Sequence, residues 1–258
     1  MNKEIAFLKK NVPETFRKFY KENIGNRERK TRFDFVTEID KNIEEFLIKK
    51  IKSAFPDDHI LSEETNSRTV FDGRTWTIDP IDGTINMIHS IKLFGIQLSL
   101  YDNGEIVVAY IYFPHFNDEY YAIKDCGCYK NGTLVSVDKN VGLEDAIISF
   151  GDYSHSEPKQ AERQHLAIGY LYSQIAKIRM FGSAAIDFAM VANGSIASCV
   201  VLTKNSWDIL PGYLLAKEAG AIMTNTLGEE FKIGDYGLVA SANEAIKKLV
   251  IDSLNIKQ

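Results

Sequence analysis

The chain has 258 residues, of which 45% are apolar and 25% charged, a composition typical of a globular protein with a sizeable core. It corresponds to one large domain or two fused halves and excludes the disordered, collagen-like and disulfide-stapled classes. The 30 basic and 35 acidic side chains give a net charge of −5 and form no basic block. We therefore expect no binding to nucleic acid or to a membrane.

The cysteine content and the apolar runs indicate a cytoplasmic protein. Cys126, Cys128 and Cys199 are too few, and odd in number, for a secreted disulfide framework, and Cys126-Gly-Cys128 lacks the spacing of a zinc site. Residues 1–10 carry charges where a secretory signal is apolar. The longest apolar run, residues 196–202, is far shorter than the roughly 18 residues of a membrane span.

The first half of the chain is predicted to contain two helices followed by an antiparallel sheet. The second helix is the clearer one, because Ile39, Ile43, Leu47 and Ile51 recur on one face at helical spacing. Residues 76–137 are rich in strand-forming side chains. Asp102-Asn-Gly104 and Asn131-Gly132 interrupt these runs with the turn chemistry of β-hairpins.

The second half is predicted to alternate strands and helices. The expected strands are residues 146–150, 177–181, 197–202, 221–224 and 238–241, and the expected helices are residues 162–173, 184–192 and 207–219. The fold class is therefore α+β, with an N-terminal half over residues 1–145 and a C-terminal α/β half over residues 146–258. Since no Pro-, Gly- or Ser-rich linker separates them, we expect the halves to pack as one body.

The most informative segment is Trp76-Thr-Ile-Asp-Pro-Ile-Asp-Gly-Thr84, in which a short strand runs into a sharp turn. Asp79 and Asp82, three residues apart on this turn, can converge on one cation together with the Ile81 carbonyl, and oxygen ligands of this kind suit Mg²⁺. The backbone N–H groups of Gly83 and Thr84, at the start of a helix, suit a phosphate. A turn with helix caps and no metal remains an alternative for this segment alone.

Other acidic residues occupy comparable positions. Glu63 and Glu64 follow an apolar run, and Asp208 lies near the start of the last clear helix, where capping is the simpler explanation. Asp40 completes a capping-box pattern that begins at Thr37.

These segments together resemble the inositol monophosphatase family of Mg²⁺-dependent, lithium-sensitive phosphatases, over nearly the whole chain. The matching blocks, in chain order, are Asp34-Phe-Val-Thr-Glu-Ile-Asp40, Ile60-Leu-Ser-Glu-Glu64, Trp76-Thr-Ile-Asp-Pro-Ile-Asp-Gly-Thr84 with Asn86, Gly182-Ser-Ala-Ala185, and Trp207-Asp208 through Glu218-Ala-Gly220. The resemblance implies a layered α-β-α-β-α sandwich, also found in fructose-1,6-bisphosphatase, and a homodimer.

The resemblance also implies roles for individual residues. Metal ligands would be Glu63, Asp79, the Ile81 carbonyl, Asp82 and Asp208, holding two or three Mg²⁺ per subunit. Thr84 with Asp40, together with Glu63, would form the catalytic set that orients and deprotonates the attacking water. Substrate would contact Asp82, Gly83, Thr84, Ser183, Ala184 and Asp208. Two Mg²⁺ would balance the four negative charges of Glu63, Asp79, Asp82 and Asp208.

The chain departs from the family pattern at several positions. Ile85 and Met87 replace a Thr and an aromatic residue behind the turn, which we expect to be tolerated. Val201 stands where inositol-selective members carry a Glu that binds ring hydroxyls, so inositol specificity is in doubt. The lysine of the family's mobile loop corresponds to Arg29 or Lys30, and the sequence alone does not decide between them.

The expected function is hydrolysis of a small phosphate monoester: inositol monophosphate, the 2′-phosphate of NADP or fructose 1,6-bisphosphate. Two alternatives stay open. One is a phosphatase of the haloacid-dehalogenase type, but the two aspartates of its motif are two residues apart, whereas Asp79 and Asp82 are three apart. The other is a degenerate family member that binds a cation and acts as a non-catalytic partner protein.

Overall fold

The computed structural model describes residues 2–20, 27–32, 35–65, 67, 71–155 and 157–256. Asp34, which belongs to one of the matching blocks, lies outside these residues. The helices are α1 (Lys3–Phe19), α2 (Glu38–Ala54), α3 (Thr84–Ile88), α4 (Pro158–Leu171), α5 (Ala184–Ala192), α6 (Ser206–Glu218), α7 (Glu244–Leu254) and the short 3₁₀ helix η1 (Leu143–Asp145).

Two large sheets account for most of the strands, and a short hairpin of β1 (Arg27–Arg29) and β2 (Phe35–Thr37) lies apart from them. The first sheet contains β3 (His59–Ser62), β4 (Thr75–Asp82), β5 (Gly95–Asp102), β6 (Glu105–Phe113), β7 (Asp118–Ile123), β8 (Cys128–Lys130) and β9 (Thr133–Val135). The second contains β10 (Ile147–Phe150), β11 (Lys177–Arg179), β12 (Ser198–Val201), β13 (Ile222–Thr224) and β14 (Leu238–Ser241).

The first sheet is a meander whose strands pair in sequence order from β3 to β9. β3 is parallel to β4, and every later neighbour is antiparallel. One face packs on α1 and α2, because the apolar stripe of α2 meets core residues such as Trp76 and Tyr110. The predicted α2 face is confirmed for Ile39, Ile43 and Leu47, which are buried.

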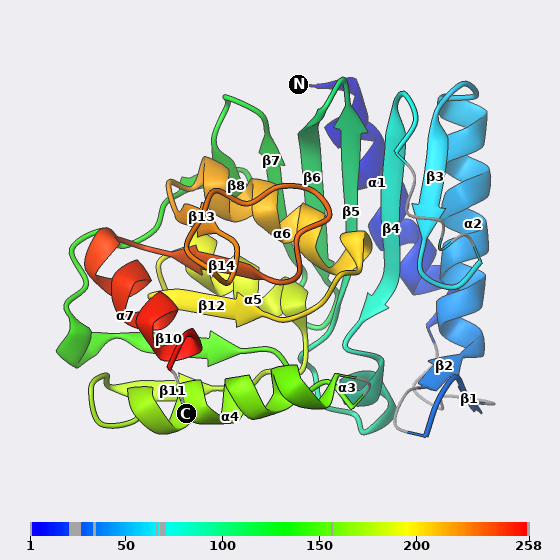
Figure 1. The fold of residues 1–258 in the computed structure, drawn as a ribbon. Coiled ribbons are helices and arrows are strands. Elements are labelled where there is room, and N and C mark those ends of the chain that lie inside the picture. The colour runs from blue at the N-terminus through cyan, green and yellow to red at the C-terminus, as the bar shows by residue number, and fades with distance from the viewer. Residues whose placement is uncertain are drawn as a thin grey trace.

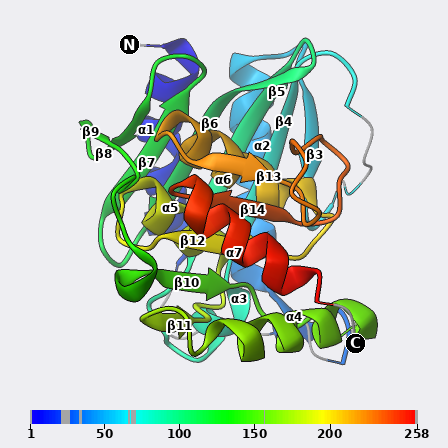
Figure 2. The same cartoon turned by 60° about the vertical axis from the view of Figure 1, so that its left-hand side comes forward.

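The second sheet has the strand order β11-β10-β12-β14-β13, with β10 parallel to both of its neighbours. Helices α5 and α6 fill the space between the two sheets, and α4 and α7 cover the outer face of the second sheet (Figures 1 and 2). The layers therefore run α1/α2, first sheet, α5/α6, second sheet, α4/α7. This is the α-β-α-β-α sandwich that was predicted.

The boundaries agree with expectation more closely in some elements than in others. Helix α5 coincides with the predicted residues 184–192, whereas α4 begins at Pro158 rather than at residue 162 and α7 was not predicted. The strands of the first sheet precede residue 145 and those of the second follow it. The division into halves 1–145 and 146–258 remains a prediction. Within the described residues, no helix is both long and apolar enough to cross a bilayer.

Candidate active site

The turn between β4 and α3 is shaped by a bulge and a glycine. The pairing of β4 with β5 shifts register between Asp79 and Asp82, so the end of β4 turns out of the regular ladder. Gly83 has a φ of +92°, and a Cβ there would lie 3.0 Å from the Leu93 carbonyl oxygen and 3.1 Å from that of Gly182. Only glycine fits this conformation, and α3 starts directly after it at Thr84.

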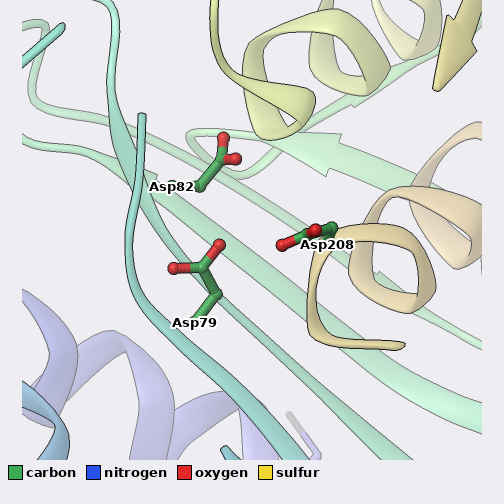
Figure 3. A group of neighbouring side chains, drawn as sticks. All are labelled: Asp79, Asp82 and Asp208. Carbon is green, nitrogen blue, oxygen red and sulfur yellow. The ribbon is translucent and has the colours of Figure 1, made fainter. Parts of the chain in front are cut away.

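Three aspartates meet at this turn. Single carboxylate oxygens of Asp79, Asp82 and Asp208 lie within 4.8 Å of one another, and Figure 3 shows the two side chains of the turn facing the one from the start of α6. Burial and the charges of Glu63, Asp82 and Asp208 raise the pKa of Asp79 well above its usual value. Burial, followed by the charges of Glu63 and Asp82, does the same to the pKa of Asp208. A cation at this position would relieve the repulsion.

Asp82 is oriented by the N-terminus of α5. The backbone N–H groups of Ala184 and Ala185 donate to its carboxylate at 3.2 and 2.8 Å, and the Ser183 hydroxyl also donates to it. Burial raises the pKa of Asp82 to about 6, although these three hydrogen bonds favour the charged form. The predicted substrate contacts Ser183 and Ala184 therefore lie next to the cluster of three aspartates, and they are hydrogen-bonded to its member Asp82.

The two other aspartates have hydrogen-bond partners of their own. Asp79 accepts hydrogen bonds from the Gln97 side-chain amide at 3.1 Å and from the Ile81 backbone N–H at 3.0 Å. Asp208 accepts a hydrogen bond from the Asn205 side chain at 3.0 Å. Each carboxylate is thus held in place while keeping oxygen atoms directed toward the shared centre, which is the arrangement of a site for a hard cation.

Thr84 and Asp40 form the predicted pair. The Thr84 hydroxyl lies 2.9 Å from Asp40 Oδ1 and 2.9 Å from the Ile81 carbonyl oxygen. Asp40 is fully buried and also accepts from the Thr37 backbone N–H at 3.0 Å, which completes the predicted capping box of α2. Burial raises the pKa of Asp40, an environment that suits a proton acceptor.

Glu63 lies beside the cluster, and a lysine contacts its carboxylate. The parallel pairing of β3 and β4 places Ser62 opposite Ile78, so Glu63 follows at the level of Asp79. Lys30 Nζ is 2.7 Å from Glu63 Oε1 and 2.5 Å from Glu64 Oε1. Arg29 instead donates to the Arg32 carbonyl, so the structure places Lys30, not Arg29, at the site.

Sequence reasoning missed a further acid, Glu44. This residue of α2 is fully buried and accepts from the Ser62 hydroxyl at 3.0 Å and from the Glu64 backbone N–H at 2.8 Å. It thereby fixes the segment that carries Glu63. Glu44 falls on the apolar face of a predicted helix, and an acid at such a position was the available clue.

A cavity of about 190 Å³ opens beside the aspartate cluster. It is lined by Asp82, Gly151, Asp152, Gly182, Ser183, Ala184, Val201, Leu202, Thr203 and Asp208. Val201 is therefore a wall residue of this cavity as well as a buried residue of β12. Asp152 was not predicted, although an acid two residues after the predicted strand 146–150 was a clue. Burial raises the pKa of Asp152, and His155 opposes this shift.

Comparison with known proteins places the chain in a family. The sequence model of the inositol monophosphatase family matches residues 3–258. The fructose-1,6-bisphosphatase/inositol-1-monophosphatase of Thermotoga maritima is 36% identical, with 80% of this chain and 78% of the relative covered. The inositol-1-monophosphatase of Bacillus subtilis is 33% identical over 85% and 83% of the two chains. The Nus factor SuhB of Vibrio cholerae is 28% identical over 84% and 81%.

Solved structures agree with this placement. An inositol monophosphatase from Thermotoga maritima superposes with a TM-score of 0.87 at 31% identity, covering 98% of this chain and 96% of the other. An inositol monophosphatase/NADP phosphatase complexed with Mg²⁺ and phosphate has a TM-score of 0.83 at 25% identity, covering 99% and 95%. A staphylococcal enzyme soaked in LiCl as an inhibitory complex has a TM-score of 0.85 at 25% identity, covering 99% and 94%. The chain therefore belongs to the inositol monophosphatase family and is a phosphatase, a hydrolase of phosphoric monoesters.

Proposed function

We propose that this phosphatase is Mg²⁺-dependent and hydrolyses inositol monophosphate and other small phosphate esters by direct attack of water. The observation that carries the proposal is the meeting of Asp79, Asp82 and Asp208 beside the Gly83–Thr84 turn. The cluster offers only oxygen ligands, and its repulsion in the metal-free state favours a divalent cation. The relative crystallised with Mg²⁺ and phosphate supports the same assignment.

The metal-binding set that we propose contains Glu63, Asp79, the Ile81 carbonyl, Asp82 and Asp208, for two or three Mg²⁺ per subunit. The donor set fits, since four carboxylates and one carbonyl suit a hard cation. When bound, the metal would lower the pKa of a water and stabilise charge on the phosphoryl and leaving oxygens. Glu63 would have to exchange its contact with Lys30 for the metal.

The remaining steps fall to side chains and backbone of the chain itself. Thr84 orients the attacking water, and Asp40 accepts the proton through the Thr84 hydroxyl at 2.9 Å. The N–H groups of Gly83 and Thr84 hold the phosphate. Asp82 and Asp208 border the cavity that receives the alcohol, together with Ser183 and Ala184. No covalent phosphoryl-enzyme is part of this scheme.

The proposed substrate range is broad. Relatives carry the names fructose-1,6-bisphosphatase/inositol-1-monophosphatase and NADP phosphatase, so the corresponding esters are proposed for this chain beside inositol monophosphate. Val201 supports this breadth, because it leaves an apolar wall where a Glu would bind ring hydroxyls. We also propose that the protein is a cytoplasmic homodimer and that Li⁺ inhibits it, as the staphylococcal relative suggests for Li⁺.

Phosphate release with and without Mg²⁺ tests the proposal. Inositol 1-phosphate, fructose 1,6-bisphosphate, NADP and p-nitrophenyl phosphate are incubated with the purified protein in EDTA or in excess Mg²⁺. We expect turnover only with Mg²⁺. When the substrate carries a radiolabelled phosphate, we expect no label on the protein after acid quench. A trapped phosphoryl-enzyme would support the covalent alternative. No turnover of any ester would favour the alternative of a non-catalytic partner protein. A relative named Nus factor SuhB is the reason to test that alternative.

A further inference from the structure

We propose that Asp152 selects the alcohol part of the substrate by accepting hydrogen bonds from the hydroxyl groups of a polyol monophosphate. This inference rests on the proposed phosphatase function and narrows its substrate class. Asp152, two residues after the end of β10, would supply the hydroxyl-binding carboxylate that Val201 on β12 lacks. Phosphate esters of polyhydroxylated alcohols would then be preferred over esters whose alcohol has no hydroxyl donors or carries a second anionic group.

The register of the second sheet places Asp152 next to the wall formed by Val201. β10 and β12 are parallel, with Phe150 opposite Val200. The Gly151 N–H donates to the Val200 carbonyl at 2.9 Å, so the chain continues beside β12 after the strand ends. A Cβ on Gly151 would lie 3.9 Å from the Val201 Cα. Asp152, the next residue, is therefore one strand away from the position that lacks a Glu.

Asp152 lies on the cavity that would receive the alcohol part of the substrate, next to the cluster of three aspartates. Asp152 lines the same 190 Å³ cavity as Asp82 and Asp208, whereas Asp79 is not among its lining residues. The charge of Asp152 contributes to the raised pKa of Asp82, so the two carboxylates are electrostatically close. An alcohol that leaves from a phosphate held by the Gly83 and Thr84 N–H groups, beside Asp82 and Asp208, would extend into the cavity that Asp152 lines.

The Asp152 carboxylate is available for a ligand. It is exposed rather than packed in the core, it lines the cavity, and the only basic group with which it interacts among the described residues is His155. An ionised carboxylate only accepts hydrogen bonds, so hydroxyl donors satisfy it, whereas a second phosphate would be repelled. The neighbouring walls formed by Val201 and Leu202 are apolar and provide no competing acceptor side chain. Asp82 and Asp208 line the same cavity but belong to the aspartate cluster, so Asp152 is the carboxylate left to bind hydroxyl groups of the alcohol and to discriminate between alcohols.

The test compares kcat/KM for three esters in the wild type and in Asp152→Ala and Asp152→Asn. The esters are inositol 1-phosphate, p-nitrophenyl phosphate, whose leaving group has no hydroxyl donor, and fructose 1,6-bisphosphate, which carries a second phosphate. Asp145→Asn is the matched control, because it removes the same charge from an exposed residue on the approach to the same strand.

We expect Asp152→Ala to lower the ratio of kcat/KM for inositol 1-phosphate to that for p-nitrophenyl phosphate by about tenfold to a hundredfold, the loss of one hydrogen bond to a charged acceptor. Asp152→Asn should retain part of this ratio. In both variants, kcat/KM for fructose 1,6-bisphosphate should rise relative to kcat/KM for p-nitrophenyl phosphate. Asp145→Asn should leave the ratios unchanged.

Two results would overturn the inference while leaving the phosphatase function intact. An inositol ratio that stays within twofold of the wild type in both variants would remove Asp152 from the alcohol pocket. An equal loss on all three esters, accompanied by a higher Mg²⁺ requirement, would make Asp152 part of the metal site instead. If the wild type hydrolyses none of the esters, the proposed function itself fails, which is a distinct outcome.

Discussion

Asp82 shows how one side chain connects the metal-type cluster with the alcohol pocket. It belongs to the three-aspartate group, it accepts hydrogen bonds from the N–H groups at the start of α5, and it lines the cavity. The sequence predicted its position from the Asp-Pro-Ile-Asp-Gly-Thr spacing. Local sequence could not predict Asp152 or Glu44 as site residues, because their importance depends on pairing between strands and on helix burial that are set by the tertiary fold.

A second prediction at the scale of single residues is that the Thr84 hydroxyl is essential for turnover. Thr84→Ala removes the group that connects the attacking water to Asp40, and we expect kcat to fall by about 10²- to 10⁴-fold. Thr84→Ser keeps the hydroxyl and should retain most of the activity. Steady-state kinetics at saturating Mg²⁺ measure both variants. If Thr84→Ala and Thr84→Ser behave alike, the hydroxyl has no part in proton transfer.

At the scale of elements, helices α5 and α6 set the geometry of the site, because each carries site residues in its first turn or just before it. Their contact depends on Gly212, where an added Cβ would lie 2.0 Å from the Phe188 ring. The sequence predicted both helices from their apolar patterns, but it could not predict this close approach. The register of β10 against β12, which builds the cavity wall, was equally beyond a pattern of single residues.

Gly212→Ala should therefore destabilise the protein. Overpacking of this kind costs about 1–3 kcal/mol, and roughly 2–4 °C in Tm per kcal/mol is expected for a chain of this size. Gly169→Ala is the matched control, since α4 leaves open space around Gly169 and the change should raise Tm slightly. Thermal unfolding followed by circular dichroism measures both. A Tm for Gly212→Ala equal to or above the wild type would contradict the packing described here.

At the scale of the whole molecule, the α-β-α-β-α layering brings together acids that are far apart in the sequence. Asp79 and Asp82 come from the C-terminal end of β4 in the first sheet, and Asp208 comes from a helix between the sheets. Bringing these carboxylates together lowers the stability of the fold, because burial and mutual repulsion disfavour their charged forms. Asp79 and Asp208 have strongly raised pKa values, and Asp82 has a pKa of about 6, so the metal-free fold carries a destabilising charge cluster.

This cluster predicts how stability depends on pH and Mg²⁺. A raised carboxyl pKa means that the folded protein binds more protons than the unfolded chain between about pH 4 and the folded pKa values, so the metal-free protein should lose stability as pH rises through that window. Mg²⁺ binds the ionised carboxylates and should remove the penalty. At one hundred times Kd it adds about 2.7 kcal/mol, or roughly 5–10 °C in Tm.

Calorimetry at pH 5 and pH 8, in EDTA and in Mg²⁺, measures this effect. Tm in EDTA should be lower at pH 8 than at pH 5, and the increase caused by Mg²⁺ should be larger at pH 8. Asp208→Asn should reduce both differences, since it removes one charge of the cluster. An Mg²⁺ effect of the same size at both pH values would mean that these carboxylates do not bind the metal.

The central claim, a phosphatase site built on the three aspartates, is tested most directly by the turnover of Asp79→Asn. The change removes one charge from the middle of the cluster and keeps the shape of the side chain, and Asp57→Asn, at an exposed position, is the control. Phosphate release from inositol 1-phosphate is measured at saturating Mg²⁺ for the wild type and both variants. We predict that Asp57→Asn matches the wild type and that Asp79→Asn loses at least about 10³-fold in kcat. A kcat for Asp79→Asn within tenfold of the wild type would contradict the account.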